Sequence, residues 1–262
     1  MSGILNQRFN GPTRTWHSSP NVDDEPNVML RVVIGTFVLY GVLQGAASGL
    51  GSTRGECGVF VALLVIGVGI LIQYLLHNET WKELGLAAPA GRGIWTALIV
   101  AVVLLVLGTI YALIAGGAAE VTPAAPWLLL GMFAQGGIAE ELVFRGYLFG
   151  HIRRSRPFWR AALISAIPFA LVHLTLFLTL PWAIALTALV MSVVTTFPLS
   201  WLYELGGRTI WAPAVLHTVL QAVPKLITLD GATFQIIWMV GGMIVAWSAF
   251  VVRREHEADV RH

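Results

Sequence analysis

The sequence predicts an all-α, polytopic membrane protein with about eight transmembrane helices. The chain has 262 residues, of which 56% are hydrophobic and only 11% are charged, and its mean hydropathy is +0.76. Soluble globular domains are about 45–50% apolar, so this chain is too apolar to belong to that class. Apolar stretches of about 20 residues, the length that spans the hydrocarbon core of a bilayer, also recur along the chain.

Eight such stretches organise the chain into one transmembrane domain, residues 28–252. The expected spans are residues 29–49, 57–77, 93–116, 126–150, 158–179, 182–203, 209–229 and 233–252. The first span starts too far from the first residue, and is too long, to be a signal peptide, so we expect it to remain as an anchor. The polar residues 1–27 predict a disordered cytoplasmic tail, and residues 253–262 predict a second cytoplasmic tail.

Two connections between the spans have recognisable sequences. Residues Thr80 to Leu86 predict a short interfacial helix with an amphipathic face, between the second and third spans. Pro181 marks a tight connection at residues 179–183, between the fifth and sixth spans.

The distribution of basic residues predicts the orientation. Lys and Arg in short loops collect on the cytoplasmic side of a membrane. With the N-terminus inside, 13 of the 16 basic residues are cytoplasmic: Arg8, Arg14, Arg31, Lys82, Arg92, Arg153, Arg154, Arg156, Arg160, Arg208, Arg253, Arg254 and Arg261. Only Arg54 and Lys225 lie outside, and Arg145 lies within a span. An even number of spans, with both termini in the cytoplasm, follows.

Charge and cysteine content exclude other classes. The net charge is +2 and the pI is near 8.9, and the basic residues lie at helix ends rather than in a stripe, so we expect no nucleic-acid partner. Cys57 is the single cysteine, which excludes an intrachain disulfide, and we expect it to be a buried, inert thiol.

The fourth span contains two adjacent carboxylates and an arginine, Glu140, Glu141 and Arg145. Each ionisable group at the bilayer centre costs about 2.5–3.5 kcal/mol on insertion scales, so three of them require partners, water or a function. Glu141 and Arg145 stand four residues apart on one helix face and can form an ion pair. Glu140 points about 100° away and remains free.

A free glutamate in a low-dielectric site is a suitable general base. Burial and a neighbouring carboxylate both raise its pKa towards neutrality. The alternative is a polar cluster that only joins helices, although helices in membranes are joined more often by Ser, Thr, Asn or Gln.

Two histidines, His173 and His217, lie deep in the fifth and seventh spans. At 1.5 Å per residue, Glu140, His173 and His217 lie roughly 20, 22 and 14 Å from the cytoplasmic ends of their helices, a similar depth for all three. A carboxylate and two imidazoles around water are the groups that activate water, with or without a metal. Each histidine taken alone is equally consistent with a hydrogen-bonded core residue.

Gln221 follows His217 by one helical turn. Its amide N–H can face an oxyanion on the same side of the helix. A hydrogen bond between helices is an alternative role for this side chain.

In this order, Glu140-Glu141-x-x-x-Arg145, Phe169-x-x-x-His173 and His217-x-x-x-Gln221 resemble the motifs of the CAAX prenyl endopeptidase and bacteriocin-processing (CPBP, Abi) family. The resemblance covers residues 126–221. It implies an eight-helix intramembrane protease of the type II CAAX endopeptidase kind, whose site opens towards the cytosol.

The resemblance also implies residue roles. Glu140 would activate the attacking water, His173 and His217 would position the water or, with Glu140, bind a divalent metal such as zinc, and Glu141 and Arg145 would support the site. The family's last motif more often ends in Asn or Asp, so Gln221 departs from it by one methylene. The implied partners are the lipid bilayer and a membrane-associated peptide or protein, prenylated or not.

Two other function classes remain open. The same fold can serve as a non-catalytic membrane scaffold or immunity protein. A proton-coupled transporter with a Glu and His relay is disfavoured, because the chain has neither an internal repeat nor paired broken helices. The compact loops favour a prokaryotic plasma membrane.

Overall fold

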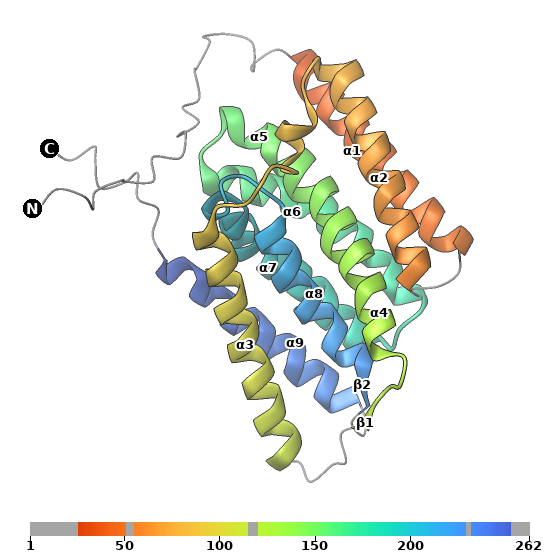
Figure 1. Ribbon diagram of the computed structural model, residues 1–262, viewed down its shortest axis with the longest axis vertical. Coiled ribbons are helices and arrows are strands. Elements are labelled where there is room, and N and C mark those ends of the chain that lie inside the picture. Colours follow the sequence, from red (N-terminus) through yellow and green to blue (C-terminus); the bar gives the residue numbers. More distant parts are fainter. Residues whose placement is uncertain (1–25, 51–54, 115–119, 229–231, 253–262) are drawn as a thin grey trace, which may run out of the picture.

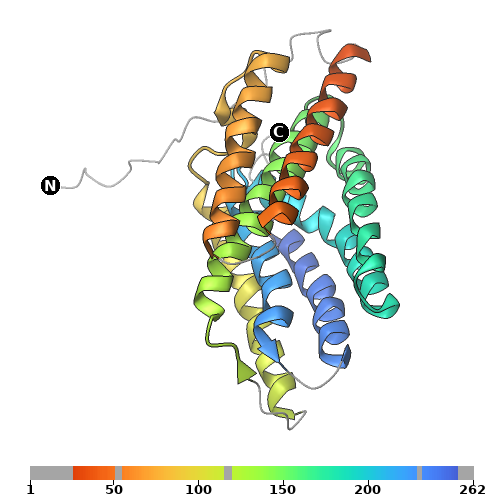
Figure 2. The ribbon, with the colours of Figure 1, turned by 90° about the vertical axis from the view of Figure 1, so that its right-hand side faces the viewer.

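A computed structural model describes residues 26–50, 55–114, 120–228 and 232–252 of the chain. Eight helical segments run roughly side by side (Figures 1 and 2). They are α1 (Pro26–Leu50), α2 (Gly55–His77), α3 (Gly91–Ile114), a segment that begins with α4 (Ala125–Met132) and ends with α5 (Gly150–Ser155), α6 (Phe158–His173), α7 (Trp182–Leu205), α8 (Trp211–Leu226) and α9 (Ala232–Ala246). The predicted all-α, polytopic membrane fold is confirmed. Its strands in the described residues are short, β1 (Glu120–Val121) paired antiparallel with β2 (Ile227–Thr228).

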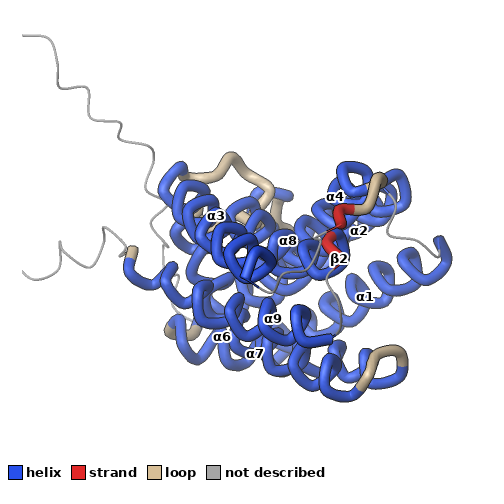
Figure 3. The backbone as a smooth tube through the Cα atoms, turned by 90° about the horizontal axis from the view of Figure 1, so that it is seen from below, coloured by secondary structure: helices blue, strands red, loops and turns tan. Residues whose placement is uncertain are grey.

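Seven of these segments, within the described residues, are long and apolar enough to cross a membrane. The exception is α8, which has only 16 residues because the chain leaves the helix to form β2. Figure 3, viewed along the bundle, shows α8 among α3, α4 and α9 rather than on the outer surface. Its apolar side chains Leu216 and Leu220 are buried against the other helices. A helix that is covered by protein on several sides does not need the length of a lipid-facing span.

Both predicted connections are present, and the helical turn between α2 and α3 is shorter than expected. Residues Trp81–Leu84 form one turn of 3-10 helix (η1), which Gly85 ends with a φ of 75°, a left-handed conformation that glycine adopts readily. Pro181 caps the start of α7, after a 3-10 turn at Leu174–Leu178 (η4). Residues 1–25 and 253–262 of the predicted tails lie outside the described residues. Pro26 and Asn27, which were predicted to end the first tail, instead begin α1.

The helix termini define two ends of the bundle. At the first end, Arg31 near the start of α1 donates a hydrogen bond to the carbonyl of Leu76 near the end of α2, and Arg153 of α5 bonds Glu204 near the end of α7. We call it the arginine-rich end because the Lys and Arg residues there are Arg31, Lys82, Arg92, Arg153, Arg154, Arg156, Arg160 and Arg208. α1 begins at this end, and the last 3-10 turn, Trp247–Val251 (η5), finishes there, since Trp201 of α7 bonds the carbonyl of Val252.

The opposite end holds the remaining helix termini. Trp127 at the start of α4 donates a 2.6 Å hydrogen bond to Glu56 at the start of α2. The β1–β2 pair joins the entry to α4 and the exit from α8 at the same end. The helices therefore alternate in direction, and the first begins at the same end at which the last finishes.

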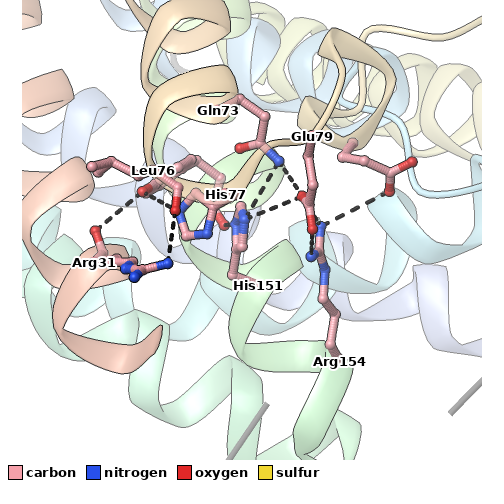
Figure 4. A network of polar contacts seen from close by, with 9 residues as sticks. Arg31, Gln73, Leu76, His77, Glu79, His151 and Arg154 are labelled. Carbon is pink, nitrogen blue, oxygen red and sulfur yellow. Dashed lines mark hydrogen bonds and ion pairs between the residues drawn. The ribbon is translucent and has the colours of Figure 1, made fainter. Parts of the chain in front are cut away.

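A polar network closes the arginine-rich end (Figure 4). Glu79 accepts hydrogen bonds from both terminal nitrogens of Arg154, one of them at 2.7 Å, and from Gln73, and its Oε2 lies 3.7 Å from Nε2 of His151. Burial alone would raise the pKa of Glu79, but the contacts with His151 and Arg154 outweigh it and lower this pKa from 4.5 to about 2. Glu79 therefore stabilises the fold in its ionised form.

We expect Glu79→Gln to lower the melting temperature at neutral pH. Because the folded-state pKa of Glu79 is depressed, its contribution to stability is complete above about pH 4.5 and is lost as the pH falls towards 2. The difference in melting temperature between the parent and Glu79→Gln should therefore shrink over this range. Glu83→Gln is the control, because Glu83 also faces Arg154 but at 3.9 Å, farther than Glu79 does, so its replacement should have a smaller effect on the melting temperature. A difference that is independent of pH would contradict the assignment.

Candidate active site

The helix that carries Glu140 and Glu141 changes its winding where they lie. Between α4 and α5 the backbone forms two π-helical segments, η2 (Phe133–Glu140) and η3 (Leu142–Phe149), with Glu141 at their junction. π-helical turns widen the helix and occur frequently at functional sites. No sequence pattern predicted this change in winding. The turn lies halfway along the 31-residue span Ala125–Ser155.

Glu141 is the centre of a buried polar cluster. Its Oε1 accepts a 3.0 Å hydrogen bond from Arg145, as the four-residue spacing predicted, and lies 2.5 Å from Nδ1 of His217 on α8. The side chains of Glu141 and Arg145 are 0% and 1% exposed, so neither can contact a substrate without a rearrangement. Glu141 therefore joins the fourth helical segment to α8 and fixes the His217 ring.

Arg145 is enclosed by residues that sequence reasoning did not identify. Its Nη2 lies 3.4 Å from the hydroxyl of Thr196 on α7, and its guanidinium lies 4.4 Å from the ring centre of Phe169 on α6. An aromatic face attracts a cation, most strongly where water is excluded. Phe169 was noted only as the first residue of a motif, and Thr196 had no distinguishing spacing, because a contact between distant helices leaves no local pattern.

Glu140 and His217 face each other at the edge of this cluster. Oε2 of Glu140 lies 3.8 Å from Nε2 of His217, and the two side chains are 24% and 12% exposed. A carboxylate can only accept, so Nδ1 of His217 carries the proton in its contact with Glu141, and Nε2 is left for other partners. A water within about 2.8 Å of both Glu140 Oε2 and His217 Nε2 fits this separation.

His173 lies on α6, where the helix ends. Its Nδ1 is 2.7 Å from the carbonyl oxygen of Phe169, and the Phe169 ring contacts the imidazole edge-on, with ring centres 4.7 Å apart. Because a carbonyl only accepts, Nδ1 of His173 donates and Nε2 is the nitrogen left for a ligand. Both histidines are thus held through Nδ1.

Gln221 is held close to the backbone of η2. Its Nε2 donates to the carbonyl of Met132 at 3.3 Å, which is the interhelical hydrogen bond considered as its alternative role. Gly136 permits this approach, since a Cβ at that position would lie 1.7 Å from the same nitrogen. An amide nitrogen carries two hydrogens, so one N–H of Gln221 remains for a ligand.

Glu140, His173, His217 and Gln221 all line one cavity of about 410 Å³. Its other walls include the polar side chains Tyr40, Gln44, Thr175, Ser192, Thr195, Lys225 and Gln235, and apolar side chains from α1, α6, α7, α8 and α9. The four predicted residues are therefore together, and Glu141 and Arg145 lie behind them. The cavity extends from the middle of the bundle towards the end opposite the arginines, where Lys225 lies.

Glu140, His173 and His217 are the side chains that would hold a metal ion at this site. Both histidines leave Nε2 available while Nδ1 is hydrogen-bonded, an arrangement common in zinc sites. Within residues 26–50, 55–114, 120–228 and 232–252, however, no three His, Cys, Asp or Glu side chains lie close enough together to hold one ion. The residues as placed do not form a complete metal site.

The fold and the site define a polytopic helical membrane protein with an ionisable cluster and a cavity at mid-depth. Residues 122–223 match the family model described as type II CAAX prenyl endopeptidase Rce1-like. This match confirms, over these residues, the resemblance seen in the motifs. The match contains Glu140, Glu141, Arg145, His173, His217 and Gln221. No curated protein and no solved structure matches the chain.

Proposed function

We propose that the chain is an intramembrane endopeptidase that hydrolyses a peptide bond of a membrane-associated substrate with a water activated by Glu140. The observation that carries this proposal is the pairing of Glu140 Oε2 with His217 Nε2, 3.8 Å apart, at the wall of a cavity large enough for a peptide segment. Both atoms are able to accept hydrogen bonds from the same water.

In this mechanism Glu140 is the general base. It takes a proton from the water as the water oxygen attacks the carbonyl carbon of the scissile bond, and His217 accepts the second hydrogen and fixes the direction of attack. Glu140 then returns the proton to the leaving nitrogen as the C–N bond breaks, so the products are a carboxylic acid and an amine. No step requires a metal.

Glu141 and Arg145 act as positioning residues. Arg145 neutralises Glu141, and Glu141 holds the proton of His217 on Nδ1, so that Nε2 remains an acceptor at the water. His173 contributes a second imidazole to the cavity wall, from the end of α6. Gln221 offers its remaining amide N–H to the oxyanion that forms on the carbonyl carbon.

We expect Gln221→Leu to lower kcat about 10²–10³-fold, the usual cost of one oxyanion donor, with little change in KM. Gln235→Leu is the matched control, because Gln235 lines the same cavity from α9. Rates of peptide hydrolysis and melting temperatures of both variants give the comparison. A Gln221→Leu variant that loses stability but keeps its kcat would assign Gln221 to the hydrogen bond with Met132 alone.

The proposed function is tested by a cleavage screen with purified protein and a library of membrane-associated peptides, prenylated and unprenylated. Cleavage by the parent and none by Glu140→Ala is the expected result. Absence of cleavage of any peptide would favour the scaffold or immunity reading. A parallel screen with a chelator decides the cofactor, because activity lost to the chelator and restored by zinc would mean that the histidines hold an ion during turnover.

A further inference from the structure

The walls of the active-site cavity come from one half of the bundle. They include Tyr40 and Gln44 in the second half of α1, Thr175 in η4, Lys225 in the last turn of α8 and Gln235 in the first turn of α9. Each of these positions lies between the middle of the bundle and the end opposite the arginines. Thr175 and Lys225 are also exposed.

The reactive groups connect to that end over a short distance. Lys225 follows His217 by eight residues on the same helix, which corresponds to about 12 Å along the axis. Both residues line the cavity, as does Gln221 between them. Water and a peptide can therefore reach Glu140 from the end where Lys225 lies.

In the described part of the chain, a polar network closes the arginine-rich end. Arg154, Glu79, His151 and Gln73 bond to one another across it (Figure 4). Beneath this network the chain packs Tyr147 and Phe149, which are fully buried. A second cavity at this end has only about 120 Å³ and is bounded by the network, without any of the proposed catalytic residues.

The two ends differ strongly in basic residues. Eight Lys and Arg side chains lie at the arginine-rich end, whereas Lys225 is the one described Lys or Arg at the opposite end. Short loops rich in Lys and Arg stay in the cytoplasm. This rule places the arginine-rich end in the cytoplasm, and the cavity then faces away from it. The family resemblance implied a site open to the cytosol, and that expectation and the charge distribution cannot both hold for this cavity.

We propose that the active-site cavity opens on the non-cytoplasmic face of the membrane. Its substrate is a peptide segment of a membrane-anchored or exported protein that enters from that face. A lipid-modified tail in the cytoplasm would meet the closed, arginine-rich end. The assignment of a substrate rests on the proposed endopeptidase function, whereas the direction of the opening does not.

The test uses thiol accessibility, for which the chain is well suited because Cys57 is its single cysteine. In a Cys57→Ser background, Thr175→Cys and Lys225→Cys each place one thiol at the cavity. Ser155→Cys is the matched control, an exposed position at the arginine-rich end. Each variant is treated with a small, charged, membrane-impermeant methanethiosulfonate reagent in spheroplasts and in inverted membrane vesicles.

We expect Thr175→Cys and Lys225→Cys to react in spheroplasts and Ser155→Cys to react in inverted vesicles. The reverse pattern would overturn the proposal. Cavity thiols that react in neither preparation would also overturn it, because the cavity would then be closed to water at this end. Labelling needs no catalysis, so it is repeated with Glu140→Gln. The expected labelling in both proteins, together with no peptide cleavage by the parent, would contradict the proposed function but leave the direction of the opening intact.

Discussion

Replacing Glu140 with Gln is expected to lower the rate of peptide hydrolysis by about 10²–10⁴-fold, the range that general acid and base catalysis contributes. The glutamine keeps the size of the side chain and can still hydrogen-bond to water, but it cannot take a proton from it. The side chain of Glu140 is 24% exposed at the cavity wall and forms no part of the buried pair behind it, so folding should be unaffected. The measurement is the single-turnover rate of purified protein, together with its melting temperature.

Glu56→Gln is the control for that substitution. Glu56 accepts a hydrogen bond from Trp127 at the end opposite the arginines and does not line the active-site cavity. Its replacement should leave kcat unchanged. Full hydrolytic activity in a normally folded Glu140→Gln variant would refute the mechanism and favour the scaffold reading.

Replacing Arg145 with Ala is expected to reduce the amount of folded protein. The change leaves the carboxylate of Glu141 buried without its cation, at a cost of about 3–5 kcal/mol. It also removes the packing of the guanidinium on Phe169 and its contact with Thr196. Yield after membrane extraction and the melting temperature in detergent measure the effect.

Two further variants define what the Arg145 result means. Arg145→Lys should be intermediate, because an ammonium still pairs with Glu141 but cannot reproduce the planar, forked contact. Arg156 is an exposed arginine that directly follows α5, and the Arg156→Ala variant should have a melting temperature close to that of the parent. If Arg145→Ala were as abundant and thermostable as the parent yet inactive, Arg145 would have a chemical role rather than a structural one.

Sequence reasoning predicted the fold because its signals are local. The length of each apolar stretch and the positions of the arginines are properties of short segments, and they yielded eight helices with alternating directions. The length of α8 was overestimated by several residues, since Ile227 and Thr228, which follow it, belong to β2. Pairing with β1, about 100 residues earlier in the chain, is not encoded in the segment itself.

The features of the site that depend on residue positions within one helix were predicted from the sequence. Glu141 and Arg145 pair as their spacing required, and the depths of Glu140, His173 and His217 agreed well enough to expect one cavity. The contact between Glu141 and His217 was not expected, because it joins two helices and depends on the π-helical winding at residues 133–149. The end of the bundle towards which the cavity extends depends on how α1, α6, α7, α8 and α9 come together, which no single segment of the sequence encodes.

We propose that Glu140, His173 and His217 act as one unit on a single water. It is tested most directly by comparing single-turnover hydrolysis rates of Glu140→Gln, His173→Ala and His217→Ala with those of the two double variants that contain Glu140→Gln. Groups that act together lose activity non-additively. We expect that adding either histidine change to Glu140→Gln leaves the residual rate about the same. Losses that multiply in the double variants would contradict it, because each residue would then contribute independently of the others.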